Sequence, residues 1–220
     1  MTATRQFDLI VFDWDGTLYD STALIARCIQ AACADLGVPV PSDRDASYVI
    51  GMGLAEALQH AAPTLPRERY GELAQRYRHH YFGRQHEIAF FDGALTLLQA
   101  LRTRGHQLAV ATGKSRVGLD SALNTAELAG VFDATRTADE TASKPDPRML
   151  HELMAQLGVA PARTLMIGDT THDLQLAANA GTASLGVSYG AHDPAAFAAF
   201  PTLHVAHSVT ELSDWLHRHA

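Results

Sequence analysis

Two aspartates, Asp13 and Asp15, end the first apolar stretch of the chain, FDLIVFDWDGTL over residues 7–18. A short apolar run that stops at a turn signal such as Asp-Gly is typical of a buried strand. Side chains two residues apart in a strand point the same way, so both carboxylates are predicted to face one pocket, with Asp15 at the strand end or already in the loop. Such a pair repels unless a cation or a shared proton offsets its charge. The pair predicts a metal or acid–base site, and a strand followed by an ordinary Asp-Gly turn is the simpler alternative.

Further polar clusters follow later in the chain, most of them directly after a strand-like run. Taken singly, they are explained by a loop, a solvated lysine or a helix-capping pair. The carboxyl ends of parallel strands share one edge of a sheet, which is where sites of open α/β sheets lie. Their order along the chain therefore favours one shared site. The clusters are Asp13 with Asp15, Thr112 with Gly113, Lys144, and Asp169 with Asp173.

The arrangement of predicted elements indicates an α/β fold with an insertion. From residue 91 onward strands and helices alternate, which predicts a parallel sheet covered by helices. Residues 20–87 show helical spacing and no convincing strand. We therefore predict a discontinuous core over residues 1–18 and 91–220, and a helical cap over residues 19–90. Predicted strands cover residues 107–111, 131–135, 164–168, 183–187 and 203–205; predicted helices cover 23–36, 42–49, 54–61, 66–82, 93–103, 115–128, 147–157, 172–180 and 209–217.

Composition excludes several classes of protein. A formal charge of −7 over 220 residues argues against nucleic acid as a main partner. Cys28 and Cys33 have neither metal-ligand nor redox spacing and suit a reducing compartment. Neither a leader peptide nor a membrane-length apolar run is apparent, so we expect a cytoplasmic protein without a membrane partner. The only lysines are Lys114 and Lys144. The sequence leaves the choice between a monomer and a homodimer open.

The clusters resemble the motifs of the haloacid-dehalogenase-like superfamily of aspartyl-phosphate phosphohydrolases, over the whole chain. The resemblance implies a Rossmann-like core with a helical cap inserted between the first and second motifs. The matching segments are DWDGT from Asp13 to Thr17, LAVAT ending at Thr112, SKPDP containing Lys144, and GDTTHD from Gly168 to Asp173.

The resemblance also implies roles for these residues. Asp13 is expected to be the nucleophile and Asp15 the general acid and base. Mg²⁺ is the expected cofactor, because hard cations prefer oxygen ligands. The phosphoryl group is expected to be contacted by Thr112, the Gly113 amide and Lys144. The metal is expected to be held by Asp13, a carbonyl near Asp15, Asp169 and Asp173, with Asp173 binding directly or through water. Lys114 is either a further phosphate contact or a solvated lysine.

The expected activity is hydrolysis of a small phosphorylated metabolite, resembling the phosphoglycolate phosphatases. Nucleotidases, sugar-phosphate phosphatases and pyrophosphatases of the family remain alternatives. Asp15 argues against the halide-removing members, and the lack of cap lysines against the phosphonate-cleaving ones. Ile25 stands where related sugar-phosphate mutases carry a histidine, which disfavours a mutase. A catalytically silent binding protein is the non-enzyme alternative. The loop at residues 51–53 either reaches into the site or is a plain interhelical turn.

Overall fold

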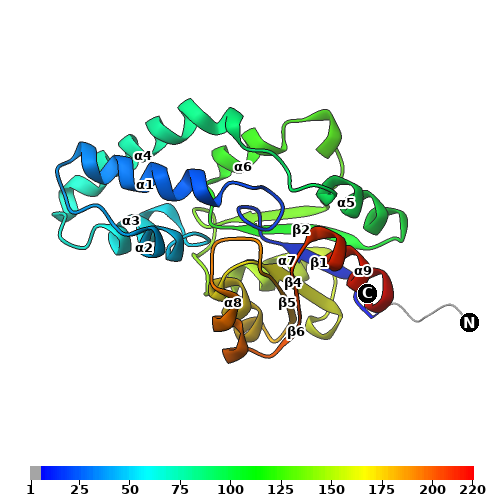
Figure 1. Ribbon diagram of the computed structural model, residues 1–220. Coiled ribbons are helices and arrows are strands. Elements are labelled where there is room, and N and C mark those ends of the chain that lie inside the picture. The colour runs from blue at the N-terminus through cyan, green and yellow to red at the C-terminus, as the bar shows by residue number, and fades with distance from the viewer. Residues whose placement is uncertain (1–5) are drawn as a thin grey trace, which may run out of the picture.

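The core of the protein is a parallel sheet whose strand order reverses direction beside the first strand (Figure 1). The computed structural model describes residues 6–220, and residues 1–5, which the predicted core includes, lie outside the described residues. The order of the six strands is β3-β2-β1-β4-β5-β6, which is that of doubly wound α/β folds. The strands are β1 (Leu9–Phe12), β2 (Gln107–Thr112), β3 (Ala134–Thr137), β4 (Thr164–Gly168), β5 (Ala183–Val187) and β6 (Thr202–Ala206).

The sheet is covered on both faces, and every residue of its two central strands β1 and β4 is buried. Ile10 and Phe12 of β1 contact one apolar cluster, whereas Leu9 and Val11 contact another on the opposite face. Helices α5, α6 and α9 cover the first face, and α7 and α8 cover the second (Figure 1). This double coverage explains the continuous apolar runs that predict the strands. The helices are α5 (Ala94–Thr103), α6 (Arg116–Leu123), α7 (Arg148–Leu157), α8 (Thr171–Ala180) and α9 (Val209–His219).

The remaining helices form a separate layer that lies over the carboxyl ends of the strands, with an apolar cluster of its own (Figure 1). The chain leaves the sheet near Tyr19 and returns beside it at Phe90, and these two residues form an isolated antiparallel bridge. Trp14 is buried under this crossing and stacks on Tyr19 with 5.1 Å between ring centroids. On this basis we propose that residues 19–90 form the cap. Its helices are α1 (Thr22–Asp35), α2 (Asp43–Tyr48), α3 (Leu54–Ala61) and α4 (Tyr70–Arg84).

Three predicted elements differ from the structure by three residues or more. The helix predicted over residues 66–82 begins as a 3-10 turn, Arg67–Arg69, and continues as α4. The predicted strand over residues 131–135 begins later, as β3, because the Asp133 carboxylate accepts a hydrogen bond from the Leu108 amide at 2.8 Å and ends the preceding loop. The helix predicted over residues 115–128 ends at Leu123. Asn124 and Thr125, both weak helix formers, interrupt it before a 3-10 turn over Ala126–Leu128. Ser115 is the N-cap of this helix, since its hydroxyl accepts from the Gly118 amide at 3.2 Å.

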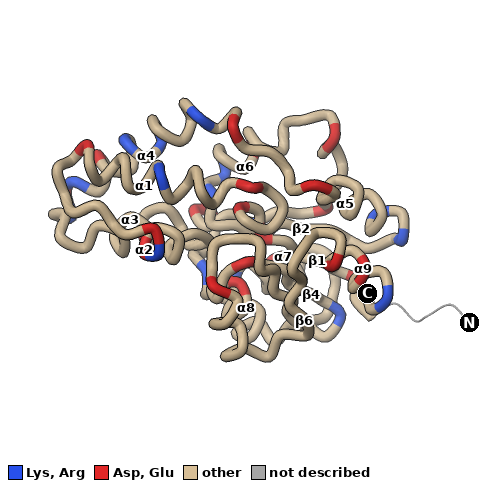
Figure 2. The backbone as a smooth tube through the Cα atoms, viewed as in Figure 1, with Lys and Arg blue, Asp and Glu red and all other residues tan. Residues whose placement is uncertain are grey.

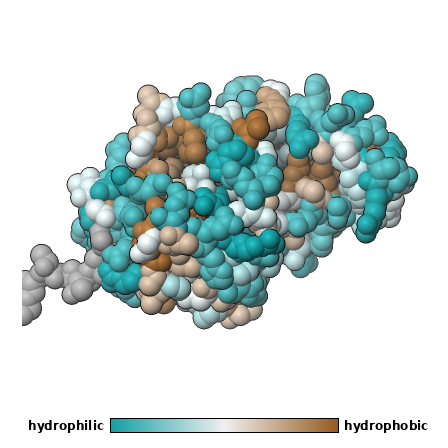
Figure 3. Space-filling model, turned by 180° about the vertical axis from the view of Figure 1, so that it is seen from behind, coloured by the Kyte–Doolittle hydropathy of each residue, from teal (hydrophilic) through white to brown (hydrophobic). Residues whose placement is uncertain are grey.

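The surface is mainly polar. Seen from behind, hydrophobic residues lie in small patches that hydrophilic residues separate (Figure 3). Within residues 6–220 no helix is long and apolar enough to cross a membrane.

Candidate active site

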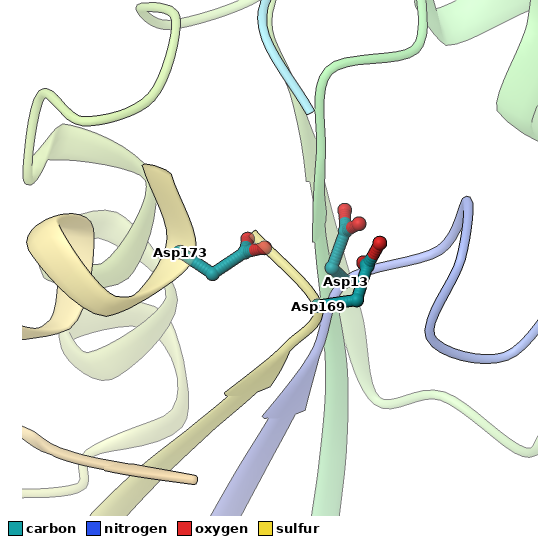
Figure 4. A group of neighbouring side chains, drawn as sticks. All are labelled: Asp13, Asp169 and Asp173. Carbon is teal, nitrogen blue, oxygen red and sulfur yellow. The ribbon is translucent and has the colours of Figure 1, made fainter. Parts of the chain in front are cut away.

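The site lies where the winding of the sheet changes direction, between β1 and β4. Asp13 and Asp169 directly follow these neighbouring strands, and the Asp13 amide donates to the Ile167 carbonyl at 2.9 Å. Asp173, in the first turn of α8, faces both (Figure 4). One carboxylate oxygen from each of the three aspartates lies within 4.8 Å of the others, and all three residues are buried. The fold thus creates the crevice at a topological switch point in which α/β proteins bind ligands.

Lys144 is the counter-charge of this cluster. Its Nζ lies 2.6 Å from Asp13 Oδ1 and 2.7 Å from Asp173 Oδ1, and the side chain has no exposure to solvent. Burial disfavours the ammonium, but the two carboxylates outweigh this and raise the Lys144 pKa above its ordinary value. Lys144 is therefore a charged residue of the site and not a solvated lysine.

Negative charge exceeds positive charge at this point. Three carboxylates face one ammonium, which leaves two formal negative charges when all four groups are ionised. Burial raises the pKa of Asp13 well above its ordinary value, and burial with the nearby Asp173 raises that of Asp169 to about 7. Among the described residues, Asp13 Oδ2 has no hydrogen-bond partner although it is buried. An unsatisfied buried acceptor among convergent carboxylates fits a divalent cation with oxygen ligands.

The Asp169 carboxylate accepts two hydrogen bonds and lies close against two glycines. Its Oδ1 accepts from the Thr17 hydroxyl at 2.9 Å and its Oδ2 from the Ala191 amide at 2.7 Å. A Cβ at Gly16 or Gly190 would overlap this carboxylate, and Gly16 also has a φ of +88° that disfavours other residues. The sequence analysis assigned no role to Thr17 or Gly190. Gly190 could have been predicted to lie near the site, because it follows β5, which ends at the same edge of the sheet.

Asp173 also caps α8. Its Oδ2 accepts from the Thr170 hydroxyl at 2.7 Å and the Thr170 amide at 3.1 Å, which completes a capping box. Asp173 therefore serves the capping box with one oxygen and contacts Lys144 with the other.

Asp15 lies beside the carboxylate cluster and is held by residues from both layers. The Ser21 hydroxyl donates to its Oδ1 at 2.7 Å, so Ser21 occupies the N-cap position of α1 without making a cap hydrogen bond through its side chain. Lys114 Nζ lies 3.0 Å from the same oxygen and 3.0 Å from Tyr81 Oη of α4. The alternative prediction that Lys114 is a solvated lysine is wrong, because its side chain is only 11% exposed. Tyr81 has no signal in the sequence that separates it from other helix residues.

Thr112 and Gly113 line the same cavity as Asp13 and Asp15. Thr112 ends β2 and is buried, and its hydroxyl accepts from the Lys114 amide at 3.2 Å. A Cβ at Gly113 would overlap the Met52 carbonyl of the cap loop. The Gly53 amide in turn donates to the Ser143 hydroxyl at 2.8 Å. The loop at residues 51–53 therefore contacts the site and is more than an interhelical turn.

The wider charge distribution agrees with this picture. Acidic residues gather in the middle of the molecule, where the cap meets the sheet, whereas basic residues lie mainly at its periphery (Figure 2). A cation is therefore attracted to the site itself, while an anionic ligand depends on the few basic groups close by, Lys114 and Lys144.

The raised pKa of Asp169 gives a testable stability effect. Its folded value of about 7 exceeds the ordinary 3.8, so between about pH 4 and pH 7 the folded protein keeps a proton that the unfolded chain has lost. The free energy of unfolding must then fall as the pH rises through this window. We expect wild type in EDTA to lose roughly 2 kcal/mol between pH 5 and pH 8 relative to Asp169→Asn, measured by urea denaturation. Saturating Mg²⁺ should remove the difference, and parallel pH profiles in EDTA would contradict the assignment.

Comparison with known proteins places the chain in a family. The haloacid dehalogenase-like hydrolase family matches residues 10–187. The chain is 36% identical over 189 residues to the protein named Probable phosphatase IndB of Dickeya dadantii, covering 84% of this chain and 82% of the relative. It is 30% identical over 191 residues to a phosphoglycolate phosphatase of Aliivibrio fischeri, covering 83% and 84%. A haloacid dehalogenase-like hydrolase of Bacteroides fragilis superposes with a TM-score of 0.86 at 25% identity, covering 94% and 99%. Since the family match spans both the sheet and the inserted helices, this chain belongs to the haloacid dehalogenase-like hydrolases.

Proposed function

We propose that this protein is a Mg²⁺-dependent phosphatase that hydrolyses the phosphomonoester of a small metabolite through an aspartyl-phosphate on Asp13, as expected from its likeness to phosphoglycolate phosphatases. Family membership and the phosphatase relatives identify the reaction class. The observation that carries the proposal is the buried cluster of Asp13, Asp169 and Asp173 around Lys144, with Asp15 two residues after Asp13.

Asp13, Asp169, Asp173 and a main-chain carbonyl near Asp15 would hold the metal. Bound there, Mg²⁺ supplies positive charge that offsets the repulsion between a carboxylate and an anionic phosphoryl group. The unpaired Asp13 Oδ2 and the surplus of carboxylates support this assignment.

The reaction proceeds in two half-reactions. An Asp13 carboxylate oxygen forms a bond to phosphorus while the ester P–O bond breaks, and Asp15 gives its proton to the departing alkoxide. Water then forms a bond to phosphorus as the bond to Asp13 breaks, and Asp15 takes a proton from that water. The products are the free alcohol and inorganic phosphate.

The other residues stabilise charge and orientation. The Thr112 hydroxyl, the Gly113 amide and the Lys144 ammonium would contact phosphoryl oxygens, where preorganised donors are most effective. Ser21 and Lys114 hold the Asp15 carboxyl at the cavity wall. These two contacts fix the position of the Asp15 carboxyl, which would serve as the proton donor.

The test is phosphate release from a substrate panel with Mg²⁺ and with EDTA. The panel contains phosphoglycolate, nucleoside monophosphates, sugar phosphates and pyrophosphate. We expect release from at least one compound, and a loss of at least about 100-fold in EDTA that added Mg²⁺ restores. Release that EDTA leaves unchanged would remove the metal from the mechanism, and no release from any compound would favour the binding-protein alternative. The cytoplasmic location stays a prediction.

A further inference from the structure

We propose that the substrate's leaving group is a short, uncharged, apolar alcohol, so that the preferred substrate is a small alkyl phosphate rather than phosphoglycolate, a sugar phosphate or a nucleotide. This inference rests on the proposed phosphatase function and narrows its substrate class. It comes from the cavity that the cap forms above Asp13.

The cavity joins the phosphoryl-binding residues to the cap. Asp13, Asp15, Thr112 and Gly113 form its floor, so a phosphoryl group bound at Asp13 directs its ester oxygen toward the cap side. The volume is about 100 Å³, well below the roughly 300–1,000 Å³ of sites for drug-sized ligands. Space of this size favours a leaving group of a few carbon atoms over a nucleoside.

The cap side of the cavity is apolar. Two helices and the segment between them supply branched aliphatic side chains, and most of these are buried in the cap's own cluster. An uncharged alkyl group that displaces water from such a wall gains about 25 cal/mol per Å² of apolar surface removed from water. The aliphatic residues of the lining are Ile25, Ile29, Val49, Ile50 and Leu54.

Polar side chains of the wall are few, and two of them, Tyr81 and Lys114, are already engaged. Tyr81 Oη and Lys114 Nζ contact each other at 3.0 Å, and Lys114 is paired with Asp15. Tyr77 is a neutral phenol, because burial raises its pKa above the ordinary value. Among the described cap residues that line the cavity, only Arg78 has a charged side chain, and Arg78 is exposed to solvent. A carboxylate or polyol placed against the aliphatic part of this wall would lose hydration without gaining matching partners there.

The decisive comparison is between isobutyl phosphate and phosphoglycolate. The two have the same branching, and two methyl groups replace the two carboxylate oxygens, so the leaving groups are similar in size while their charge differs. We expect kcat/KM for isobutyl phosphate to exceed that for phosphoglycolate at least 100-fold. Along methyl, ethyl and propyl phosphate, kcat/KM should rise about fourfold per methylene, the ratio that corresponds to about 0.8 kcal/mol.

A matched pair of variants tests the wall itself. Leu54 and Leu36 are both half-buried leucines packed on the apolar cluster of the cap, but only Leu54 lines the cavity. Leu54→Asn should lower kcat/KM for isobutyl phosphate about tenfold more than it lowers kcat/KM for methyl phosphate, whereas Leu36→Asn should affect neither. Thermal unfolding checks that each variant folds. Val49→Thr, which preserves side-chain shape, replaces Leu54→Asn should that variant fail to fold.

The outcomes separate this inference from the proposed function. A preference for phosphoglycolate, or a flat alkyl series, would overturn the inference and leave the phosphatase intact. An equal loss with both esters in Leu54→Asn would also overturn it, because the wall would then not sense the leaving group. Failure to release phosphate from any ester would instead refute the proposed function.

Discussion

Asp13→Asn is expected to reduce kcat at least about 10⁴-fold, because it removes the carboxylate that directly follows β1 at the floor of the cavity. An amide oxygen is a poor nucleophile and carries no charge to hold a cation. The fold should persist, since Lys144 keeps its contact with Asp173 and a neutral side chain reduces repulsion within a buried cluster. Steady-state phosphate release and thermal unfolding, both with Mg²⁺, measure the two effects.

Asp120→Asn is the matched control for this variant. It makes the same chemical change at an exposed carboxylate of α6, which pairs with Arg116 at 3.1 Å. Its activity should equal that of wild type. Near-normal turnover by Asp13→Asn would refute the nucleophile assignment. Capture of radiolabelled phosphate on wild type, and its absence in Asp13→Asn, would distinguish covalent catalysis from activation of water by the same carboxylate.

Lys144→Met is expected to have the second-largest effect, on both stability and rate. Removing one partner of a buried ion pair costs about 3–5 kcal/mol, and here it leaves three buried carboxylates without their ammonium. We expect the Tm in EDTA to fall by roughly 10 °C and kcat to fall about 10³-fold. A divalent cation provides counter-charge, so Mg²⁺ should restore more of the Tm of this variant than it adds to wild type.

Arg148→Met provides the comparison, because Arg148 pairs with Asp146 at 3.0 Å on the surface, where its side chain is 61% exposed. Surface pairs of this kind contribute little, so Tm and kcat should stay near the wild-type values. If Lys144→Met kept the wild-type Tm in EDTA, the three carboxylates would not be ionised together, and the charge argument for a divalent cation would fail.

The parallel sheet and most of its helices were predictable from local sequence. Residues 164–168 and 183–187 are short apolar runs bounded by turn residues, and both are strands in the structure. Hydrophobic periodicity was less reliable where residues of low helix propensity interrupt it. The segment after Leu123 shows this, because Asn124 and Thr125 interrupt a helix that periodicity alone would continue to residue 128.

The residue types of the candidate site were also readable in the sequence, because its motifs sit at strand ends and strand ends share an edge. Asp13, Thr112, Lys144 and Asp169 are predicted residues that the structure brings together. Their order and spacing along the chain are what match the motifs of the family. No such spacing marks Tyr81, which reaches Asp15 only through Lys114.

Sequence by itself predicted the fold class, the inserted helices and the residue types of the carboxylate cluster, since these depend on local periodicity and on the order of strands. The tertiary structure decided the contacts between segments that are far apart in the sequence. It buried Lys114 between Asp15 and Tyr81, directed the Ser21 hydroxyl to Asp15, and brought Gly190 against Asp169. It also built the apolar wall above Asp13 from residues whose helical pattern indicates only burial in the cap. Periodicity reports which face of an element is buried, but only packing fixes which other element lies against that face.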